Sequence, residues 1–282
     1  GSSVDAASTG STGTISMVAA TNLTADKLTS DSTITLTATA GSMSLNDTIS
    51  SESGNITATA NTTITQAATA AISTAGAGTI SMTAAGGNFD SNASITSGSG
   101  DITIEATAAD LTLSSDIISA GGAISATSGG SIIQNAALSS SGGAITVTAG
   151  DDFSQTTSST TDSSSAGDTG TVSITVENNL LSDKIISDGA VTITATSGSI
   201  TALDSITSQV GDITLTSAGQ ISQFNGSNFS TASTGGISLT SSAIISSAAM
   251  SASGRGNIDL NATAGNITMH SSSSALAGGF IH

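Results

Sequence analysis

Short segments in which apolar and polar residues alternate recur along the whole chain. In the segment 34–39, for example, Ile34, Leu36 and Ala38 alternate with threonines. A period of two residues places the apolar side chains on one face of a strand and the hydroxyls on the other. The same pattern returns as TISMV, NITATA, DITIEAT, AITVT, VTITAT and DITLT, and it predicts β-strands rather than helices.

The spacing of these segments is close to regular. Successive first apolar residues lie roughly 22 residues apart, which is within the range typical of solenoids, propellers and arrays. The residues that define this spacing are Ile15, Ile34, Ile56, Ile80, Ile102, Ile124, Ile145, Val172, Val191, Ile213, Ile237 and Ile258.

Two shorter apolar runs follow the first strand of each repeat, as in 43–45 and 49–51. Gly, Asn, Asp and Ser separate them, and these residues tolerate turn geometry. Three short strands and three corners in about 22 residues make one coil of a β-helix. We therefore predict an all-β, right-handed parallel β-helix of about 12 coils, with three short strands per coil, running as one continuous β-solenoid over residues 1–282.

A second, longer repeat is superimposed on the first. Residues 13–66 align with residues 170–223 without a gap, at an offset of 172 − 15 = 157 residues. The superrepeat therefore spans about seven coils. Copy 1 covers about residues 1–157, and copy 2, which is incomplete, covers about residues 158–282.

The two ends of the chain show no pattern typical of a solenoid cap. We expect the end coils, marked by Ile15 at one end and by Ile258 and Ile281 at the other, to stack on further copies of the repeat. An open sheet edge is a template for pairing, so the predicted partner is the protein itself.

Composition restricts the kind of core and the kind of partner. Only 8% of residues are charged, aromatics are 2%, and Pro, Cys, Trp and Tyr are absent. Hydrophobic residues still make up 37%, which is enough for a narrow core of Ile, Val, Leu and Ala. The net charge of −17, with three basic residues, argues against nucleic acid and anionic lipid as partners. No apolar run is long enough to predict a membrane span.

The sequence offers little for catalysis. Its two histidines, His270 and His282, are expected at the surface and at the chain end, and no Gly-x-Ser-x-Gly elbow or phosphate loop is present. We expect no enzyme activity and no cofactor. A polysaccharide lyase or hydrolase built on aspartates is the distant alternative, and isolated calcium sites at acidic corners are a further hypothesis. The weak metal candidates are Asp26, Asp31, Asp183, Asp188, Asp151 and Asp152.

The polar faces of the first strands form the strongest alternative. Their hydroxyls would stack as a flat ladder, which suits ice or carbohydrate binding, although threonine is also simply a good exposed strand residue. Glu105 and Asp259 interrupt this ladder. Its main members are Thr35, Thr37, Thr57, Thr59, Thr146, Thr148, Thr192, Thr194, Thr214 and Thr216.

The recurring motif Gly-[Asn/Asp]-Ile at the start of the first strand carries a family resemblance. It occurs at 54–59, 100–104, 211–215 and 256–260. This pattern resembles the filamentous-haemagglutinin-like exoproteins of bacterial two-partner secretion and the giant repetitive adhesins built on the same solenoid. The family's amino-terminal secretion domain is not visible in this sequence.

The resemblance implies a right-handed parallel β-helix, export through an outer-membrane pore, and roles in adhesion, aggregation or fibre formation. We therefore expect an extracellular or cell-surface structural protein, either the shaft of an adhesin or a surface filament or sheath. Besides itself, its expected partner is a host-cell surface or a surface polysaccharide.

Overall fold

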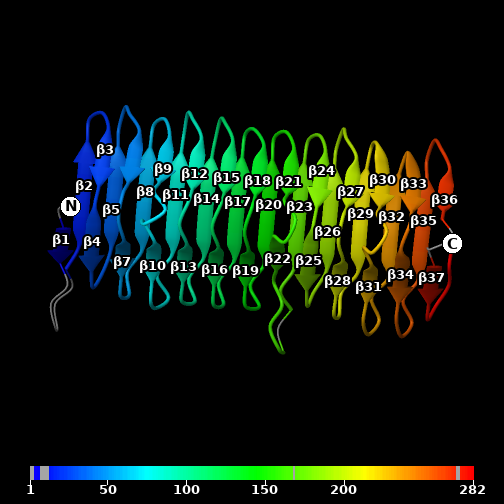
Figure 1. Cartoon of the computed structure of the whole chain (residues 1–282). Coiled ribbons are helices and arrows are strands. Elements are labelled where there is room, and N and C mark those ends of the chain that lie inside the picture. Colours follow the sequence, from blue (N-terminus) through cyan, green and yellow to red (C-terminus); the bar gives the residue numbers. More distant parts are fainter. Residues whose placement is uncertain (1–2, 7–12, 168, 271–273) are drawn as a thin grey trace. The chain divides into compact units, whose positions relative to one another are not determined.

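The computed structural model describes residues 3–6, 13–167, 169–270 and 274–282. These residues form strands and turns and include no helix. Contacts divide the chain into two compact units, residues 1–140 and residues 141–282. Each unit is built from three parallel sheets, called A, B and C (Figure 1).

In unit 1, every neighbouring pair of strands is parallel. Sheet A contains β1 (Ser3–Ala6), β4 (Lys27–Ser30), β7 (Ile49–Ser51), β10 (Ile72–Thr74), β13 (Ile95–Ser97), β16 (Ile117–Ser119) and β19 (Leu138–Ser140). Sheet B contains β2 (Ile15–Ala19), β5 (Ile34–Ala38), β8 (Ile56–Ala60), β11 (Ile80–Ala84), β14 (Ile102–Ala106) and β17 (Ile124–Ser128). Sheet C contains β3 (Leu23–Ala25), β6 (Met43–Leu45), β9 (Ile64–Gln66), β12 (Phe89–Ser91), β15 (Leu111–Leu113) and β18 (Ile132–Gln134).

Unit 2 repeats this arrangement. Sheet A contains β22 (Thr160–Asp162), β25 (Lys184–Ser187), β28 (Ile206–Ser208), β31 (Phe229–Thr231), β34 (Ala249–Ala252) and β37 (Ser274–Ala277). Sheet B contains β20 (Ile145–Ala149), β23 (Val172–Val176), β26 (Val191–Ala195), β29 (Ile213–Ser217), β32 (Ile237–Ser241) and β35 (Ile258–Ala262). Sheet C contains β21 (Phe153–Gln155), β24 (Leu180–Ser182), β27 (Ile200–Ala202), β30 (Gln220–Gln223), β33 (Ala243–Ser246) and β36 (Ile267–Met269).

The chain passes through sheets B, C and A in turn and then begins the next coil. Each unit holds six complete coils, so the prediction of about 12 coils with three strands each is confirmed. The strands proposed at 43–45 and 49–51 have those bounds in the structure, as β6 and β7. The protein is therefore a parallel β-solenoid.

The core of each unit follows from the alternation in the sequence. In β5 the first, third and fifth residues are buried and the two threonines between them are partly exposed. In unit 1 the isoleucines that begin the sheet B strands lie in register: Ile34 on Ile56, Ile56 on Ile80, and so on through Ile124. Full burial of one such side chain contributes about 1.5–3 kcal/mol, so the aliphatic stacks supply the main stabilisation.

The corner between sheets A and B depends on stacked glycines. A Cβ on Gly100 would lie 2.1 Å from the carbonyl oxygen of Gly78 in the preceding coil, so a side chain there would force the coils apart. A buried hydroxyl at the end of most sheet A strands closes this corner. Ser119 Oγ donates to the carbonyl oxygen of Gly100 at 3.1 Å, and Ser97 Oγ donates to that of Gly78 at 3.1 Å.

The superrepeat is visible in the strand bounds. Strands β2 to β11 recur as β23 to β32, and nine of these ten pairs have bounds related by the offset found in the sequence; β30 is one residue longer than its counterpart β9. The corner bonds recur too, because Ser30 Oγ donates to the Gly13 carbonyl oxygen as Ser187 Oγ donates to that of Gly170. The proposed copy boundary near residue 157 is a property of the sequence and stays a prediction.

Candidate functional site

The outward face of sheet B carries two columns of hydroxyl groups, formed by the second and fourth residues of its strands. In unit 1, Thr35 lies opposite Thr57 and Thr37 lies opposite Thr59. The columns are irregular here, because Val18 begins the second one and Glu105 follows Thr83. The ladder residues proposed from the sequence are therefore on the expected face, and Glu105 interrupts it as expected.

In unit 2 the columns are more regular. One of them consists of five threonines in unbroken register, one on each sheet B strand from β20 to β32. Neighbouring strands lie about 4.8 Å apart, so these hydroxyls and methyls form an evenly spaced row. The row contains Thr148, Thr175, Thr194, Thr216 and Thr240, and the parallel row contains Thr146, Ser173, Thr192, Thr214 and Ser238.

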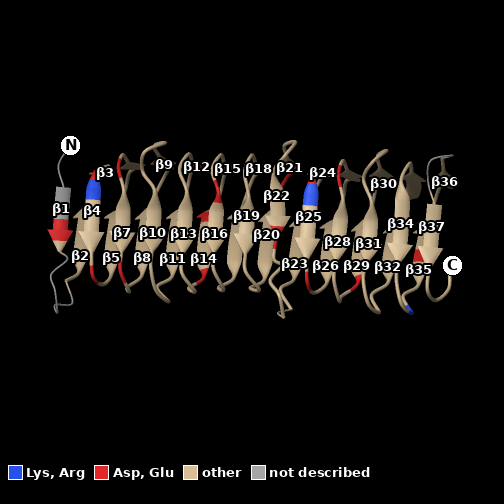
Figure 2. Cartoon of the chain, turned by 60° about the horizontal axis from the view of Figure 1, so that its bottom comes forward, with Lys and Arg blue, Asp and Glu red and all other residues tan. Residues whose placement is uncertain are grey.

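Acidic residues gather mostly at the turns between strands, where Figure 2 shows them in red. Several accept a hydrogen bond from a backbone N–H one coil further along. The Asp101 carboxylate accepts from the Ala123 amide at 2.8 Å, and the Asp110 carboxylate accepts from the Ser131 amide at 2.8 Å. These side chains continue the hydrogen-bond ladder around corners, where no strand supplies an acceptor.

The aspartates proposed as metal candidates have similar contacts. Asp26 accepts from the Asn46 side-chain amide at 3.3 Å, and Asp151 accepts from that of Asn178 at 2.6 Å. The Asp152 carboxylate accepts from the Asn179 backbone amide at 2.7 Å. Asp31 lies half-buried in the turn before β5. Within the part of the chain that the structure describes, no group of three His, Cys, Asp or Glu residues could hold a metal ion.

Two further aspartates from that set are buried beneath the turns next to β22. Asp183 is 7% exposed and Asp188 is 9% exposed. The Asp183 carboxylate accepts a hydrogen bond from the Ser158 amide at 2.6 Å, and that of Asp188 accepts one from the Ser165 amide at 2.5 Å. These two carboxylates therefore accept backbone hydrogen bonds from the turns on either side of β22 and hold those turns in place.

Buried amide side chains in sheet C were not predicted from the sequence. Gln66 and Gln223 are buried at the inward last position of their strands. A serine one coil later donates to each of them: Ser91 Oγ to Gln66 Oε1 at 2.8 Å, and Ser246 Oγ to Gln223 Oε1 at 2.7 Å. The only signal in the sequence is a glutamine in place of the aliphatic residue at the end of a short strand.

One buried hydroxyl departs from this scheme. Ser182 lies one coil after Gln155, but Gln155 Oε1 accepts from the Asp183 backbone amide at 3.0 Å instead. Among the described residues, Ser182 Oγ is the one buried side-chain oxygen or nitrogen atom without a hydrogen-bond partner. The superrepeat counterpart of Ser182 is Ala25, because 182 − 157 = 25.

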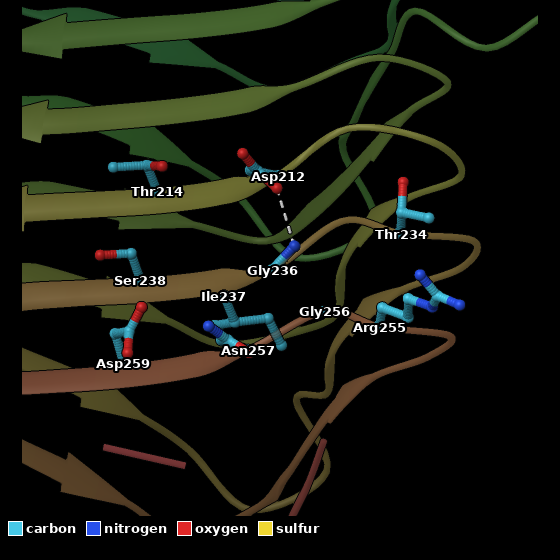
Figure 3. A pocket seen from close by; sticks show the side chains of 10 residues that line it. All are labelled: Asp212, Thr214, Thr234, Gly236, Ile237, Ser238, Arg255, Gly256, Asn257 and Asp259. Carbon is cyan, nitrogen blue, oxygen red and sulfur yellow. Dashed lines mark hydrogen bonds between the residues drawn. The ribbon is translucent and has the colours of Figure 1, made fainter. Parts of the chain in front are cut away.

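A shallow polar hollow of about 300 Å³ lies on unit 2, where the corner between sheets A and B meets the outward face of sheet B (Figure 3). Thr214, Ser238 and Asp259 line it from neighbouring strands, in register. Arg255 and Thr234 come from the corner turns on the other side. The hollow is completed by Asp212, Gly236, Ile237, Gly256 and Asn257.

Gly236 lies in the middle of this hollow (Figure 3). It occupies the position before the sheet B strand, between Asp212 and Asn257, where every other coil has a residue with a side chain. The Gly236 amide donates to the Asp212 carboxylate at 2.7 Å. In the superrepeat counterpart, the Thr79 amide donates to the Asn55 side-chain oxygen at 2.9 Å, so the backbone is held in the same way and the threonine side chain occupies the space.

A second hollow of about 300 Å³ lies on sheet A of unit 1. Hydroxyls of β4, β7 and β10, including Thr29, Ser50 and Ser73, line it together with Glu52. It holds one carboxylate and no cationic side chain. Its chemistry is therefore that of the general hydroxyl surface of the solenoid.

Neither the histidines nor the proposed end residues line these hollows. His270 is exposed after β36, as expected, and the ring of His282 contacts the ring of Phe280 at 5.8 Å between centroids. Ile15 and Ile258 are buried. Ile281, which is 54% exposed, pairs with Ile258 and covers it, so Ile281 and not Ile258 lies at the open end of unit 2.

Within the residues that the structure covers, there is no helix of the length and apolar character needed to cross a bilayer. Comparisons of the chain with protein-family models, with curated proteins and with solved structures found no match.

Proposed function

We propose that this chain is a segment of an extracellular or cell-surface structural protein, the shaft of an adhesin or of a surface filament, of the filamentous-haemagglutinin-like kind. The observation that carries the proposal is the repetition of a whole group of coils with its strand bounds preserved at the superrepeat offset. Duplication of complete coils lengthens a rod without changing its cross-section, and length is the property that a shaft needs.

The surface chemistry supports the same proposal. The outward strand positions carry mainly Thr and Ser, and the net charge of −17 keeps such rods apart sideways. Adhesion would then depend on the ends of the rod or on separate sites along it. Its partners would be further copies of the chain and a cell surface or surface polysaccharide.

The open end of unit 2 supports end-to-end stacking on a second copy of this chain. Leu276 is 69% exposed, Phe280 is 70% exposed and Ile281 is 54% exposed, all in the last coil. This coil also presents the free edges of β36 and β37, whereas residues 280–282 already pair with part of β35. A parallel strand from another copy would satisfy these edges and cover the apolar side chains, and a head-to-tail contact that does not close gives a filament.

The test compares end and side substitutions in the full chain. Leu276→Lys and Ile281→Lys place a charge in the proposed joint, whereas Val210→Lys places one in a turn of the same unit at a residue that is also 54% exposed. Light scattering and electron microscopy at rising concentration should show filaments for the unchanged chain and for Val210→Lys, and single particles for the end variants. Ile258→Lys is unsuitable because that side chain is buried.

A chain that stays monomeric at high concentration would contradict the stacking proposal, as would filaments that persist in both end variants. Location is tested separately, by labelling intact source cells with an antibody raised against the chain. Labelling only after the cells are opened would contradict the surface proposal.

The threonine row of unit 2 favours a second candidate function, ice binding. Its five threonines repeat at the strand spacing of about 4.8 Å, and the two rows lie about 6.7 Å apart along the strands. Such a flat, regular array of hydroxyl and methyl groups can order water. Thermal hysteresis that is abolished by Thr194→Lys but retained in Thr37→Lys of unit 1 would favour this candidate; its absence in the unchanged chain would exclude it.

A further inference from the structure

The hollow at Gly236 gathers polar groups that are free to bind a ligand. Among the described residues, the carboxylate of Asp259, the guanidinium of Arg255 and the hydroxyl of Ser238 make no hydrogen bond or ion pair. Thr214 and Thr234 add two further free hydroxyls. Thr214, Ser238 and Asp259 lie on the strand side of the hollow, and Arg255 and Thr234 lie on its corner side (Figure 3).

Comparison with copy 1 shows that this combination is specific to copy 2. At the superrepeat offset, Gly236 replaces Thr79, Thr234 replaces Ala77 and Asp212 replaces Asn55. When β14 is aligned with β35, the differing pairs are Arg255 for Ser99, Asn257 for Asp101 and Asp259 for Thr103. In copy 2, therefore, the glycine that leaves the hollow open occurs together with its two unpaired charged side chains, Arg255 and Asp259.

The strands below the hollow are unchanged by these differences. Thr214, Ile237 and Ser238 correspond to Thr57, Ile80 and Ser81. A Cβ at Gly236 would come no closer than 3.1 Å to the nearest atom, the Asn257 carbonyl oxygen, and its backbone is not in the left-handed region. This contact is tight, but every other coil has a residue with a side chain before its sheet B strand, so the fold accepts one here and glycine leaves the surface open.

We propose that this hollow is a binding site for one neutral sugar unit of a glycan. A pyranose ring over the strand side of the hollow presents neighbouring hydroxyls that can donate to the Asp259 and Asp212 carboxylates and accept from the Thr214 and Ser238 hydroxyls. Thr214, Ser238 and Asp259 span two strand spacings, roughly 10 Å, which matches a ring with its linkage oxygens.

The charges of the lining and of the whole chain favour a neutral sugar over an anionic one. The lining holds two carboxylates and one guanidinium, and the chain carries a net charge of −17, so an anionic sugar is repelled and a neutral one is not. The lining holds no aromatic ring on which a sugar could stack. We therefore expect an affinity of about 1 mM for a single unit. The site does not depend on filament formation, and either can fail without the other.

The experiment is an NMR titration of the full chain with the methyl glycosides of glucose, galactose and mannose, and with glucuronate as the anionic comparison. The Gly256 and Asn257 amides, which lie in the hollow, should shift and saturate with at least one neutral glycoside and not with glucuronate. Gly236→Thr, which installs the copy 1 residue, should abolish the saturable shift. Asp259→Thr, also a copy 1 residue, should weaken binding about tenfold, the effect of one charge-assisted hydrogen bond. Arg255→Ser, on the corner side of the hollow, should leave binding unchanged.

The matched control is Thr79→Gly, which opens the counterpart position in unit 1 without supplying the free charged groups; binding there should stay absent. No saturable shift up to about 100 mM of any neutral glycoside would overturn the proposal. Tighter binding of glucuronate would show that the ligand is not a neutral sugar. Retained binding in Gly236→Thr would show that the sugar does not bind at this hollow. Should Gly236→Thr fail to fold, the Asp259 variant decides, because that side chain is exposed.

Discussion

The coils from β2 to β11 and from β23 to β32 are two versions of one structure. Their strands have nearly the same bounds and the same inward pattern, whereas their corners differ. Asp26 is half-exposed in the first version, but its counterpart Asp183 is buried and accepts the Ser158 amide. The counterpart of Ser158 would be residue 1, which lies outside the described residues. Corners can thus acquire new contacts while the stack beneath them is preserved.

The hollow at Gly236 is a second place where the surface differs between the two copies while the strands beneath it are preserved. Six lining residues differ from copy 1, yet Ile237 and the strands around it keep their positions. Inward residues are restricted by the coils above and below them, whereas corner residues other than the stacked glycines are restricted mainly by the need to satisfy backbone groups. A β-solenoid can therefore change its surface chemistry one corner at a time.

The largest effect is expected from emptying matched core positions. Phe229 of copy 2 and Ile72 of copy 1 occupy the same place in sheet A, and both are buried. Phe229→Ala should lower the free energy of unfolding by about 3–5 kcal/mol and Ile72→Ala by about 2–5 kcal/mol. Phe229→Ile, the residue of copy 1, should cost less than half as much as Phe229→Ala. Guanidinium denaturation followed by circular dichroism measures all three; equal losses for both Phe229 variants would mean that the two cores are not interchangeable.

The next effect concerns the buried aspartate. Asp183→Ala removes the acceptor of the Ser158 amide and should cost about 1.5–3 kcal/mol, as expected for a hydrogen bond to a charged group. Asp26→Ala, at the matching position, should change stability by less than about 0.5 kcal/mol because Asp26 is half-exposed. The same denaturation assay applies. Equal effects of the two substitutions would show that the Ser158 contact does not stabilise the turn.

A smaller and sharper contrast lies inside sheet C. Ser246→Ala leaves the buried Gln223 Oε1 without its donor and should cost about 1–3 kcal/mol. Ser182→Ala removes a buried hydroxyl that has no partner and installs the residue of copy 1, so stability should be unchanged or slightly higher. Thermal denaturation of the two variants side by side distinguishes them. A clear loss in Ser182→Ala would indicate that its hydroxyl is bonded in solution, for instance to water.

The smallest effect is expected from Gly236→Thr, within about 0.5 kcal/mol of the unchanged chain, because every other coil has a residue with a side chain at this position and the tight 3.1 Å contact of the added Cβ with the Asn257 carbonyl oxygen needs a shift of only a few tenths of an ångström. Gly211→Ala is the contrasting substitution, since a Cβ there would lie 2.3 Å from the Ala190 backbone nitrogen. It should cost about 1–3 kcal/mol through overpacking. Urea denaturation of both variants checks this difference, and a large loss in Gly236→Thr would mean that glycine is structurally required at this position.

Much of the fold could be predicted because it is local and repeated. Alternation in 34–38 identifies a strand and its inward face, and the interval of about 22 residues identifies the coil. The hydroxyl rows could be predicted for the same reason, since Thr35 and Thr57 hold equivalent places in successive coils. The buried Gln66 and the hollow at Gly236 could not, because each depends on a neighbour in another coil, far away in the sequence.

By itself, therefore, the sequence determined the strands, their inward faces and the three-strand coil, because burial of every second residue leaves one arrangement that repetition then reinforces. Only the tertiary structure decided what the corners do. A serine, aspartate or glycine at a corner is compatible with exposure, with capping of a backbone amide or with an open hollow. Which of these three roles a corner residue has depends on the residue in the coil above or below it, about 4.8 Å away in space.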